Sequence, residues 1–502
     1  MSRSPREPRG WWASGTPLLL LLAAIAVFQL ATIRSGHVWG DDHALYMLHA
    51  RALLEGRGYA DTGFIYNPEN PWYSTAVYPP GFPLLLLPVI AGFGLNLFAM
   101  KTLVVAFLVG TAAVLALLVR RDLPGPYSLV PVALLGFQPY LTDFKDNVLP
   151  DIPFVFFILL NLVLLHRLDE RRPHGRAGVL LGLLAGVLLW YTIAVRTIGI
   201  TLFGAIALGL LLRRRMPGIA LLVCVAAAAL LVAAQRELMP AASGYATQVA
   251  TAVSQRGIAL YLPEPGKIQL LAGETFLLWQ GPPTLVRNGI GVLVLLLGAA
   301  GFAGRLRRPT IVEALVIAYG AAIFIFPVHE LRYSLPLVPL LFFYATLAFR
   351  WLILAFPRTG LVGACALGLV LAGTYGVRLA RADYGSITDG SVGPRAIDLY
   401  RAVRSCTDPD ARVLFGRARA LTLYTRRPTM PLPRPRVDLR SFLDAQAVDY
   451  AIATRGDRLD RLARDPAARL QQVYANSEFI LYRHLPAGGT RIDSPAPRCR
   501  AR

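Results

Sequence analysis

WWASGTPLLLLLAAIAVFQLATIRSGHVWGDD (residues 11–42) joins an apolar run, Trp11 to Ile33, to a polar segment with two adjacent carboxylates, Asp41 and Asp42. A helix that crosses a bilayer needs roughly 20 apolar residues, which this run supplies. The run is too long for the core of a signal peptide, and no small-residue cleavage pattern closes it. Because residues 1–10 are basic, we predict an uncleaved transmembrane helix whose N-terminus faces the cytoplasm.

The composition of the whole chain is that of a polytopic membrane protein. Hydrophobic residues make up 55% of the 502 residues and charged residues only 16%, with a mean hydropathy of +0.50, which does not fit a soluble globular chain. The net charge of +21 would suit a nucleic-acid partner. The basic residues, however, form short clusters between apolar runs instead of one basic domain. We therefore expect membrane lipids as partners and no nucleic acid.

Ten further apolar runs bring the number of predicted spans to about eleven. With the N-terminus inside, the basic clusters at 120–121, 167–176, 213–215, 305–308 and 350–358 all fall on the cytoplasmic side, as the positive-inside rule requires. The alternate loops hold most of the carboxylates and polar motifs, and they face outward: 34–96, 143–151, 194–196, 236–285 and 328–333. The ten runs are 97–119, 127–142, 152–168, 177–193, 197–212, 217–235, 286–303, 310–327, 334–355 and 360–377.

One shorter apolar run, 82–98, is interrupted by Pro88 and Gly92. Counting it as a span would place every later arginine cluster outside, so we interpret it as a segment lying on the outer leaflet. The odd number of spans then places the C-terminal tail outside. We predict a transmembrane domain, 1–378, with a large first outer loop at 34–96, and an extracytoplasmic α/β domain, 379–502.

The tail combines strand-like and helix-like patterns. The predicted strands are 412–416, 421–425, 449–454 and 478–484, and helical patterns cover 396–405 and 458–465. Cys406 and Cys499 both fall in this exported domain, where oxidation is chemically permitted, and whether they pair stays open. Cys224 and Cys365 lie within apolar runs, and no Cys/His spacing predicts a zinc site.

Asp41 and Asp42 allow two interpretations. Asp42 can simply cap a helix over 43–54 by accepting backbone N–H groups. Alternatively, an outward-facing carboxylate at the membrane surface can take the proton of an incoming hydroxyl group, which a capping residue can still do with its second oxygen.

Five motifs follow one another along the chain: WGDDHALY (39–46), YPPGFP (78–83), DNVLPDIPF (146–154), VRTIG (195–199) and HELRYSLPLVP (329–339). Their order and spacing resemble the GT-C superfamily of polyprenyl-phosphate-dependent glycosyltransferases. The chain is most similar to the branch that holds the protein O-mannosyltransferases and the bacterial lipid A aminoarabinose transferases. The likeness extends over the whole chain.

This resemblance implies an inverting transferase of the inner (plasma) membrane whose active site faces outward. In the family, the first outer loop supplies a catalytic acid, and Asp42 registers best with it. His43 stands where glutamate is common, which leaves Asp41 as the alternative. The second-loop acid maps onto Asp151, with Asp143 and Asp146 as stand-ins.

The substrates implied are a polyprenyl-phosphate-linked sugar and an acceptor hydroxyl on a lipid, glycan or protein. The departing phosphate needs a cation, which we expect to be Arg332, Arg196 or Lys145. We expect Glu330, Tyr333, His43 and Tyr78 to line the substrate site. Each arginine or lysine can also be explained by contact with lipid headgroups.

The sequence leaves alternatives open. A lipid or glycan transporter would also be polytopic, but it predicts ionisable residues near helix centres, and the runs here are almost purely apolar. An O-antigen-type ligase or polymerase, and a non-catalytic scaffold, are further alternatives. A divalent cation is possible, since three outer acids are available to hold one.

Overall fold

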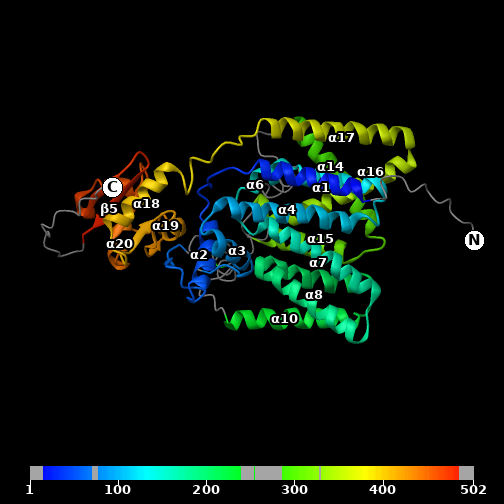
Figure 1. The fold of residues 1–502 in the computed structure, drawn as a ribbon, viewed down its shortest axis with the longest axis horizontal. Coiled ribbons are helices and arrows are strands. Elements are labelled where there is room, and N and C mark those ends of the chain that lie inside the picture. The colour runs from blue at the N-terminus through cyan, green and yellow to red at the C-terminus, as the bar shows by residue number, and fades with distance from the viewer. Residues whose placement is uncertain (1–14, 71–76, 239–253, 255–284, 327–329, 486–502) are drawn as a thin grey trace, which may run out of the picture. The chain divides into compact units, whose positions relative to one another are not determined.

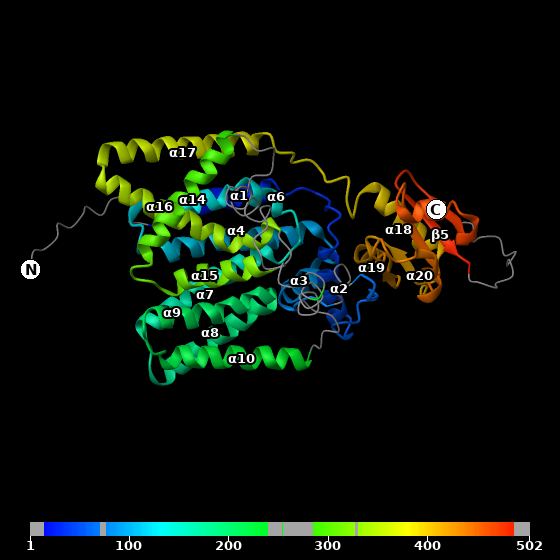
Figure 2. The ribbon, with the colours of Figure 1, turned by 180° about the vertical axis from the view of Figure 1, so that it is seen from behind.

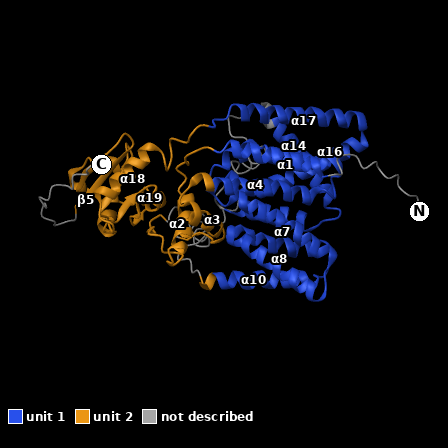
Figure 3. Ribbon diagram, viewed as in Figure 1, with its two compact units in different colours: residues 1–33, 100–235, 256–384 blue, residues 34–99, 236–255, 385–502 orange. Residues whose placement is uncertain are grey.

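The structure is a computed structural model, and it describes residues 15–70, 77–238, 254, 285–326 and 330–485. The chain divides into two compact units, shown in different colours in Figure 3. The helical unit comprises 1–33, 100–235 and 256–384. The mixed unit comprises 34–99, 236–255 and 385–502, so the first predicted outer loop groups with the C-terminal domain. Each unit is described by itself.

Long apolar helices form the helical unit (Figures 1 and 2). Helix α14 packs on α16, α15 on α9, and α7 on α8. The α-helices are α1 (Thr16–Ala31), α4 (Leu97–Val119), α5 (Leu129–Gly136), α6 (Pro139–Phe144), α7 (Asp151–Arg171), α8 (Gly175–Val195), α9 (Thr201–Leu212), α10 (Ile219–Leu238), α14 (Leu285–Arg305), α15 (Ile311–Ile325), α16 (Val338–Ala355) and α17 (Pro357–Ala380); the short 3₁₀ segments are η2 (Gly125–Ser128), η3 (Thr197–Ile200) and η6 (Leu331–Leu337).

Among the residues that the structure describes, six helical segments are long and apolar enough to cross a membrane: Leu97–Val119, Asp151–Arg171, Gly175–Val195, Ile219–Leu238, Leu331–Ala355 and Pro357–Ala380. This confirms the membrane character of the chain. Every predicted span overlaps a helix of the described residues, but the others are not among these six, so the count of eleven stays a prediction. The run 127–142 is broken, because Pro139 cannot continue α5 and begins α6 instead.

Small residues allow the helices to approach closely. A methyl group added at Gly301 of α14 would lie 2.0 Å from the carbonyl oxygen of Tyr344 on α16. Such contacts stabilise helix pairs in lipid, where apolar side chains gain nothing by leaving a solvent that is equally apolar. We therefore attribute the α14–α16 pairing to this close backbone contact.

In the mixed unit, two helices from the first predicted outer loop pack together: α2 (Asp42–Leu54) and α3 (Gly81–Phe93). Helix α3 contains Pro88 and has 13 residues, which is too few to cross the hydrocarbon core. This agrees with reading 82–98 as a non-spanning segment, although its place on the outer leaflet stays a prediction.

A five-stranded mixed sheet forms the centre of the C-terminal domain, in the order β2-β1-β3-β5-β4. Strand β1 (Val413–Phe415) pairs in parallel with β2 (Thr429–Met430) and with β3 (Tyr450–Thr454), whereas β5 (Phe479–His484) pairs antiparallel with β3 and with β4 (Leu470–Ala475). Helices cover both faces, so this domain is the predicted α/β layer structure.

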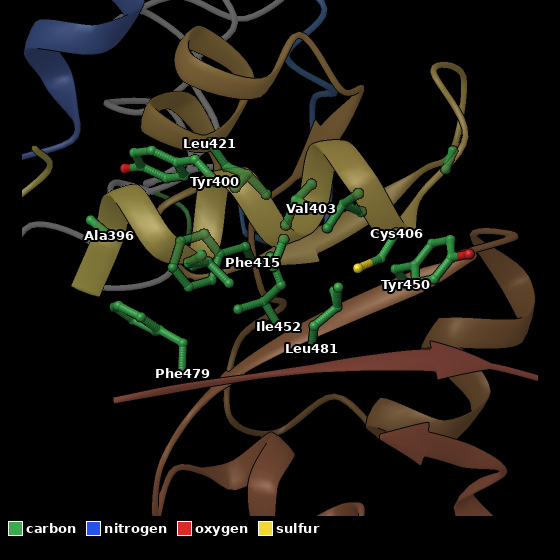
Figure 4. Packing of buried hydrophobic residues seen from close by; sticks show 14 residues of the cluster. Ala396, Tyr400, Val403, Cys406, Phe415, Leu421, Tyr450, Ile452, Phe479 and Leu481 are labelled. Carbon is green, nitrogen blue, oxygen red and sulfur yellow. The ribbon is translucent and has the colours of Figure 1, made fainter. Parts of the chain in front are cut away.

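Alternate side chains of the strands enter two separate cores. Phe415 and Ile452 contact α18 (Pro394–Cys406) and α19 (Ala418–Thr425) on one face, which Figure 4 shows from close by. Their neighbours in sequence, Leu414 and Ala451, face α20 (Leu439–Ala445) and α21 (Arg458–Leu462) on the other.

The predicted strand at 421–425 is wrong, because these residues form the second half of α19. β-branched and aromatic residues suggested a strand, but the hydroxyl groups of Thr422 and Thr425 donate to the carbonyls four residues earlier, at 3.0 and 2.6 Å, which a helix accommodates. The predicted strands at 412–416, 449–454 and 478–484 and the predicted helices at 396–405 and 458–465 are confirmed; β2, β4 and α20 were not predicted.

Cys406 is buried and disulfide-bonded. Cys499 lies outside the described residues, so the Cys406–Cys499 pairing stays a prediction.

The first loop is joined to the C-terminal domain backbone to backbone. The N–H groups of Ile387 and Ser391 donate to the carbonyls of Ser35 and His37, at 2.8 and 3.0 Å. A methyl group at Gly390 would lie 2.0 Å from the His37 oxygen. Trp39 then packs edge-on against Phe479, with ring centroids 5.6 Å apart. These contacts fix the segment that leads into Asp41 and Asp42.

The predicted topology places residue 176 inside and residue 455 outside. Both positions are exposed arginines, so each tolerates cysteine without disturbing a core. In a Cys365→Ser background, we expect an impermeant thiol reagent to label Arg455→Cys but not Arg176→Cys in intact cells. Labelling of position 176 with none at 455 would invert the orientation.

Candidate active site

The residues singled out from the sequence fall into three groups of contacts. Asp41, Asp42, His43 and Tyr78 belong to the mixed unit. Two separate groups lie in the helical unit. One holds Asp151, Arg196, Glu330, Arg332 and Tyr333, and the other holds Lys145.

Asp41 holds the N-terminus of another helix. It occupies the N-cap position of α2 but makes no side-chain cap there, and Asp42 is the first helical residue, so the alternative interpretation of Asp42 as the cap of this helix does not hold. Instead, the two carboxylate oxygens of Asp41 accept the backbone N–H groups of Arg419 and Ala420, at 3.1 and 2.9 Å, in the first turn of α19. A carboxylate at this position satisfies N–H groups that the helix cannot, and it complements the helix dipole. Burial raises the pKa of Asp41 above its usual range, although the Arg419 guanidinium and the two N–H groups oppose the shift.

Asp42 lies beside Asp41 in a different set of contacts. Its Oδ1 accepts the hydroxyl proton of Tyr78, at 2.7 Å, and an N–H of the Arg419 guanidinium, at 2.9 Å. Arg419 also donates to the Tyr78 hydroxyl oxygen, at 2.9 Å, so the three groups form a closed triangle. The Asp42 side chain keeps 32% of its surface exposed, while that of Arg419 keeps 5%. The carboxylate is therefore held in place and still accessible.

Arg419 is the buried cation of this triangle. Burial by itself would lower its pKa, but Tyr78, Asp42 and Asp41 surround it and raise the pKa above the usual value. Its guanidinium also lies over the rings of Phe64 and Tyr78, 5.3 and 5.1 Å from their centroids, where cation–π attraction adds to the ion pair. Arg419 is thus a fixed positive charge at all ordinary pH values.

Tyr78 is positioned by two residues of the first loop. The backbone N–H of Tyr78 donates to Nε2 of His49, at 3.2 Å, and its carbonyl accepts the hydroxyl of Tyr59, at 2.8 Å. Nδ1 of His49 donates to the Tyr59 carbonyl, at 2.8 Å. His49 is fully buried, and burial lowers its pKa to about 4. The ring is neutral, because a proton on Nε2 would remove the acceptor for Tyr78.

His43 is a buried structural residue. Its Nδ1 donates to the carbonyl of Gly40, its Nε2 accepts from the Ser391 hydroxyl at 3.2 Å, and its ring stacks on His37 with centroids 3.7 Å apart. The side chain is completely buried. It therefore joins the first loop to the C-terminal domain instead of facing a substrate.

Asp151 and Arg196 form the centre of the second group. Asp151 is the first residue of α7 and Arg196 follows the last residue of α8, and their side chains form an ion pair. The guanidinium of Arg196 lies over the ring of Tyr333, 5.1 Å from its centroid. Asp151 is only 1% exposed, and among the described residues its Oδ2 has no hydrogen-bond partner. A buried carboxylate oxygen without a donor is costly, so a further polar group is expected there.

Arg332 and Glu330 lie at the edge of the same group. They form an ion pair in which the Glu330 side chain is 46% exposed and that of Arg332 is 19% exposed. The guanidinium of Arg332 also lies over the Tyr333 ring, 5.5 Å from its centroid, so Tyr333 contacts both Arg196 and Arg332. The Tyr333 carbonyl accepts the Tyr319 hydroxyl at 2.9 Å, which fixes the short η6 segment to α15.

Lys145 lies apart from these residues. Its Nζ donates to the carbonyls of Thr32 and Thr142, at 2.8 and 3.0 Å, and to Oδ2 of Asp146, at 3.2 Å. These contacts use the three N–H donors of an ammonium group. Asp146 also pairs with Lys101, at 3.5 Å, and all three side chains are buried. This group stabilises the junction of α1, α4 and α6.

The described residues contain no group of three or more His, Cys, Asp or Glu side chains close enough to hold a metal ion. The acids are divided between basic partners, Asp42 with Arg419 and Asp151 with Arg196.

Sequence reasoning did not identify Arg419, Tyr59 or His49. Arg419 lies between the predicted strands 412–416 and 421–425, and its partner Asp42 is 377 positions away along the chain. No local pattern reports such a pair. His49 is on the buried face of α2, where a histidine is ordinarily part of the core.

Comparison with known proteins shows a fold but no close relative. No family model matches the chain, and no curated protein does. The crystal structure of ArnT from Cupriavidus metallidurans bound to undecaprenyl phosphate is similar, with a TM-score of 0.56, 14% identity, and 94% of this chain and 99% of that chain covered. The archaeal oligosaccharyltransferase AglB from Archaeoglobus fulgidus, in complex with an inhibitory peptide and a dolichol-phosphate, has a TM-score of 0.58 and 14% identity, over 97% of this chain and 75% of that one.

Both proteins are members of the GT-C superfamily that the motifs of this sequence resemble. The likeness extends over nearly the whole chain and so includes both units. The chain has the GT-C fold.

His49 makes the mixed unit sensitive to acid. Its pKa is about 4 in the folded state and near 6.5 unfolded, so the unfolded chain binds more protons between these values and stability falls as the pH drops through this window. At pH 5 the cost is roughly 2 kcal/mol. Thermal unfolding in detergent at pH 7 and pH 5 should show a larger loss for wild type than for His49→Gln, which keeps a donor but does not titrate. Equal losses would mean that His49 is protonated without cost.

Proposed function

We propose that this chain is a membrane glycosyltransferase that transfers a sugar from a polyprenyl-phosphate donor to an acceptor hydroxyl on the outer face of the membrane. The observation that carries the proposal is Asp42, a partly exposed carboxylate held by Arg419 and Tyr78 in a chain with the GT-C fold. The neighbours were solved with undecaprenyl phosphate and with dolichol-phosphate, which supports a lipid-phosphate donor.

Asp42 acts as the general base. As the acceptor oxygen bonds to the anomeric carbon, its proton passes to Asp42, and the bond from that carbon to the phosphate oxygen breaks. The products are the glycosylated acceptor and the polyprenyl phosphate. One displacement from the face opposite the phosphate inverts the anomeric centre. Arg419 keeps Asp42 charged, and Tyr78 fixes its orientation, so the carboxylate is in position before the substrate arrives.

Asp42 is preferred to Asp41 on the basis of its contacts. Both oxygens of Asp41 accept backbone N–H groups of α19, and protonating it would leave one of these donors unsatisfied. The Oδ1 oxygen of Asp42 accepts from two side chains, those of Tyr78 and Arg419, and side chains can adjust when the acceptor proton arrives. Asp41 is therefore the positioning residue that holds Arg419 next to Asp42.

Arg332 stabilises the charge of the departing phosphate, with Arg196 beside it. Arg332 is paired with Glu330, whose exposed carboxylate can exchange for a phosphate oxygen. Arg196 is committed to the buried Asp151 and is covered by the Tyr333 ring, so it serves mainly to position that ring and the η6 segment. Lys145 is left out, because its three donors are occupied.

The charges of the helical unit favour an enzyme over a transporter. Asp151, Asp169 and Glu313 lie in the first or last turns of their helices, whereas a transport path would place such groups near helix centres. The acceptor is a lipid, glycan or protein hydroxyl. No step is assigned to a divalent cation, because the described acids form no group that would hold one.

Asp42→Asn should abolish transfer while leaving expression and insertion intact. The amide oxygen still accepts from Tyr78 and Arg419, but the side chain no longer takes up a proton. The measurement is turnover with a panel of synthetic polyprenyl-phosphate sugars and membrane extract as acceptor. Asp61→Asn, an exposed acid of the same loop, is the matched control and should keep wild-type turnover.

The neighbouring acid separates catalysis from positioning. Asp41→Asn should lower thermal stability and reduce turnover only in part, because one of its two N–H acceptors remains. Near-normal turnover of Asp42→Asn together with loss in Asp41→Asn would exchange their roles. Full activity of both variants would make the acidic pair structural.

Arg332→Ala should lower turnover, because it removes about 2 to 4 kcal/mol of transition-state stabilisation, by analogy with the loss of one oxyanion donor. Arg332→Lys should recover only part, since a point charge replaces a planar two-point donor. Turnover in lipid nanodiscs at saturating donor compares the variants, with Arg378→Ala as the control for loss of an arginine in the same unit. Equal rates for wild type and Arg332→Ala would transfer the role to Arg196.

A further inference from the structure

A basic cavity of about 530 Å³ lies in the helical unit, away from the residues discussed above. It is lined by the end of α7, the end of α9 and the segments that follow α4, α9 and α14. Six arginines and one histidine line it against two carboxylates: Arg121, Arg213, Arg215, Arg305, Arg307, Arg308 and His166, with Asp122 and Glu170.

This cavity and Asp151 occupy opposite ends of one helix. Asp151 is the first residue of α7, and Glu170 is next to its last residue. At 1.5 Å of rise per residue, the two are roughly 28 Å apart along the helix axis. The cavity is therefore a separate site at the other end of the helical unit, the end that carries the basic loops predicted to face the cytoplasm.

One wall of the cavity is rigidly built. Arg305 donates to Asp122, at 2.7 Å, and to the buried Glu313, at 3.2 Å. Glu313 in turn accepts from the backbone N–H of Thr310, at 2.7 Å, and from the Tyr344 hydroxyl, at 3.0 Å. This capping box at the start of α15 holds Arg305 in place, so its guanidinium needs no reorganisation to meet a ligand.

The opposite wall is also paired. Arg213 forms an ion pair with Asp169, and Arg121 with Glu170, which His166 contacts at 3.1 Å. These pairs fix the ends of α7 and α9 relative to one another. They also use up the carboxylates on this side of the cavity.

Three lining arginines have no ion-pair partner among the described residues: Arg215, Arg307 and Arg308. All three are exposed and lie in the segments that close the cavity. Guanidinium groups of the same sign around one cavity repel each other, and a bound anion would relieve this repulsion. The surplus positive charge therefore points to a ligand and not to internal pairing.

We propose that this cavity binds the phosphate group of an anionic ligand, supplied by a lipid headgroup. Arginine forks match phosphate oxygens two at a time, and the cavity volume falls within the range of small-molecule sites. Basic pockets between helix ends at the cytoplasmic surface suit anionic headgroups, whose chains remain in the bilayer. Arg215, Arg307 and Arg308 contact the phosphate, while Arg305 provides the fixed side of the site.

The test compares two triple variants of the full chain by native mass spectrometry with phosphatidic acid and with phosphatidylcholine. Arg215→Gln/Arg307→Gln/Arg308→Gln should bind phosphatidic acid about 100-fold more weakly, because each substitution removes a charge-assisted hydrogen bond to the phosphate. The matched control is Arg176→Gln/Arg350→Gln/Arg358→Gln, which removes three arginines of the loops predicted on the same side that do not line the cavity. It should change the affinity less than threefold.

Equal losses of affinity for phosphatidic acid in the two variants would show diffuse attraction between arginines and headgroups and would overturn the proposed site. No loss of affinity in either variant would also overturn it. Inorganic phosphate, titrated alone, distinguishes the source of the phosphate group. Failure of millimolar phosphate to displace phosphatidic acid supports the lipid, whereas displacement that the cavity variant abolishes supports the same site with a water-soluble phosphate compound.

Discussion

The burial of Arg419 is the constraint on which the mixed unit depends. A guanidinium whose side chain is 5% exposed must have its charge and donors matched, because leaving such a group unpaired costs several kcal/mol. The acceptors come from residues far away in sequence. The guanidinium donates hydrogen bonds to Asp42 and Tyr78, and the backbone N–H of Arg419 donates to Asp41. The first loop and the C-terminal domain therefore stabilise each other through Arg419, and these contacts position the carboxylate proposed as base.

Two adjacent aspartates thus have different tasks. Asp41 accepts backbone N–H groups, which are fixed by the geometry of α19. Asp42 meets side chains, and a third of its surface reaches solvent. Asp151 repeats part of this arrangement, since it begins a helix, where the dipole favours a negative charge, and pairs with an arginine. In each case the carboxylate lies beside an arginine and at the start of a helix.

The sequence was sufficient for features that arise from local patterns. Apolar runs of about 20 residues predicted the helices, because the bilayer sets their length, and alternation predicted β1, β3 and β5. The sequence did not predict features that depend on tertiary contacts. LTLYT has the composition of a strand but forms a helix, since Asp41 caps that helix from outside and two threonines bond to its backbone. The pairing of Arg419 with Asp42 could not be predicted, because any of the many arginines in this chain would satisfy the same local rules.

The arginines of this chain also show why charge bias alone does not define a site. The positive-inside rule accounts for clusters near helix ends, and most members of such clusters need no further role. What distinguishes the cavity at the end of α7 is the combination of Arg305, immobilised by Asp122 and Glu313, with three arginines that have no such partner among the described residues. The ion pairs of Arg305 hold one wall of the cavity in place. The arginines without such pairs leave positive charge available to bind an anion. The same reasoning applies at the other end of the helix. There Arg196 is paired with the buried Asp151, whereas Arg332 is paired with an exposed glutamate, which can exchange for a phosphate oxygen.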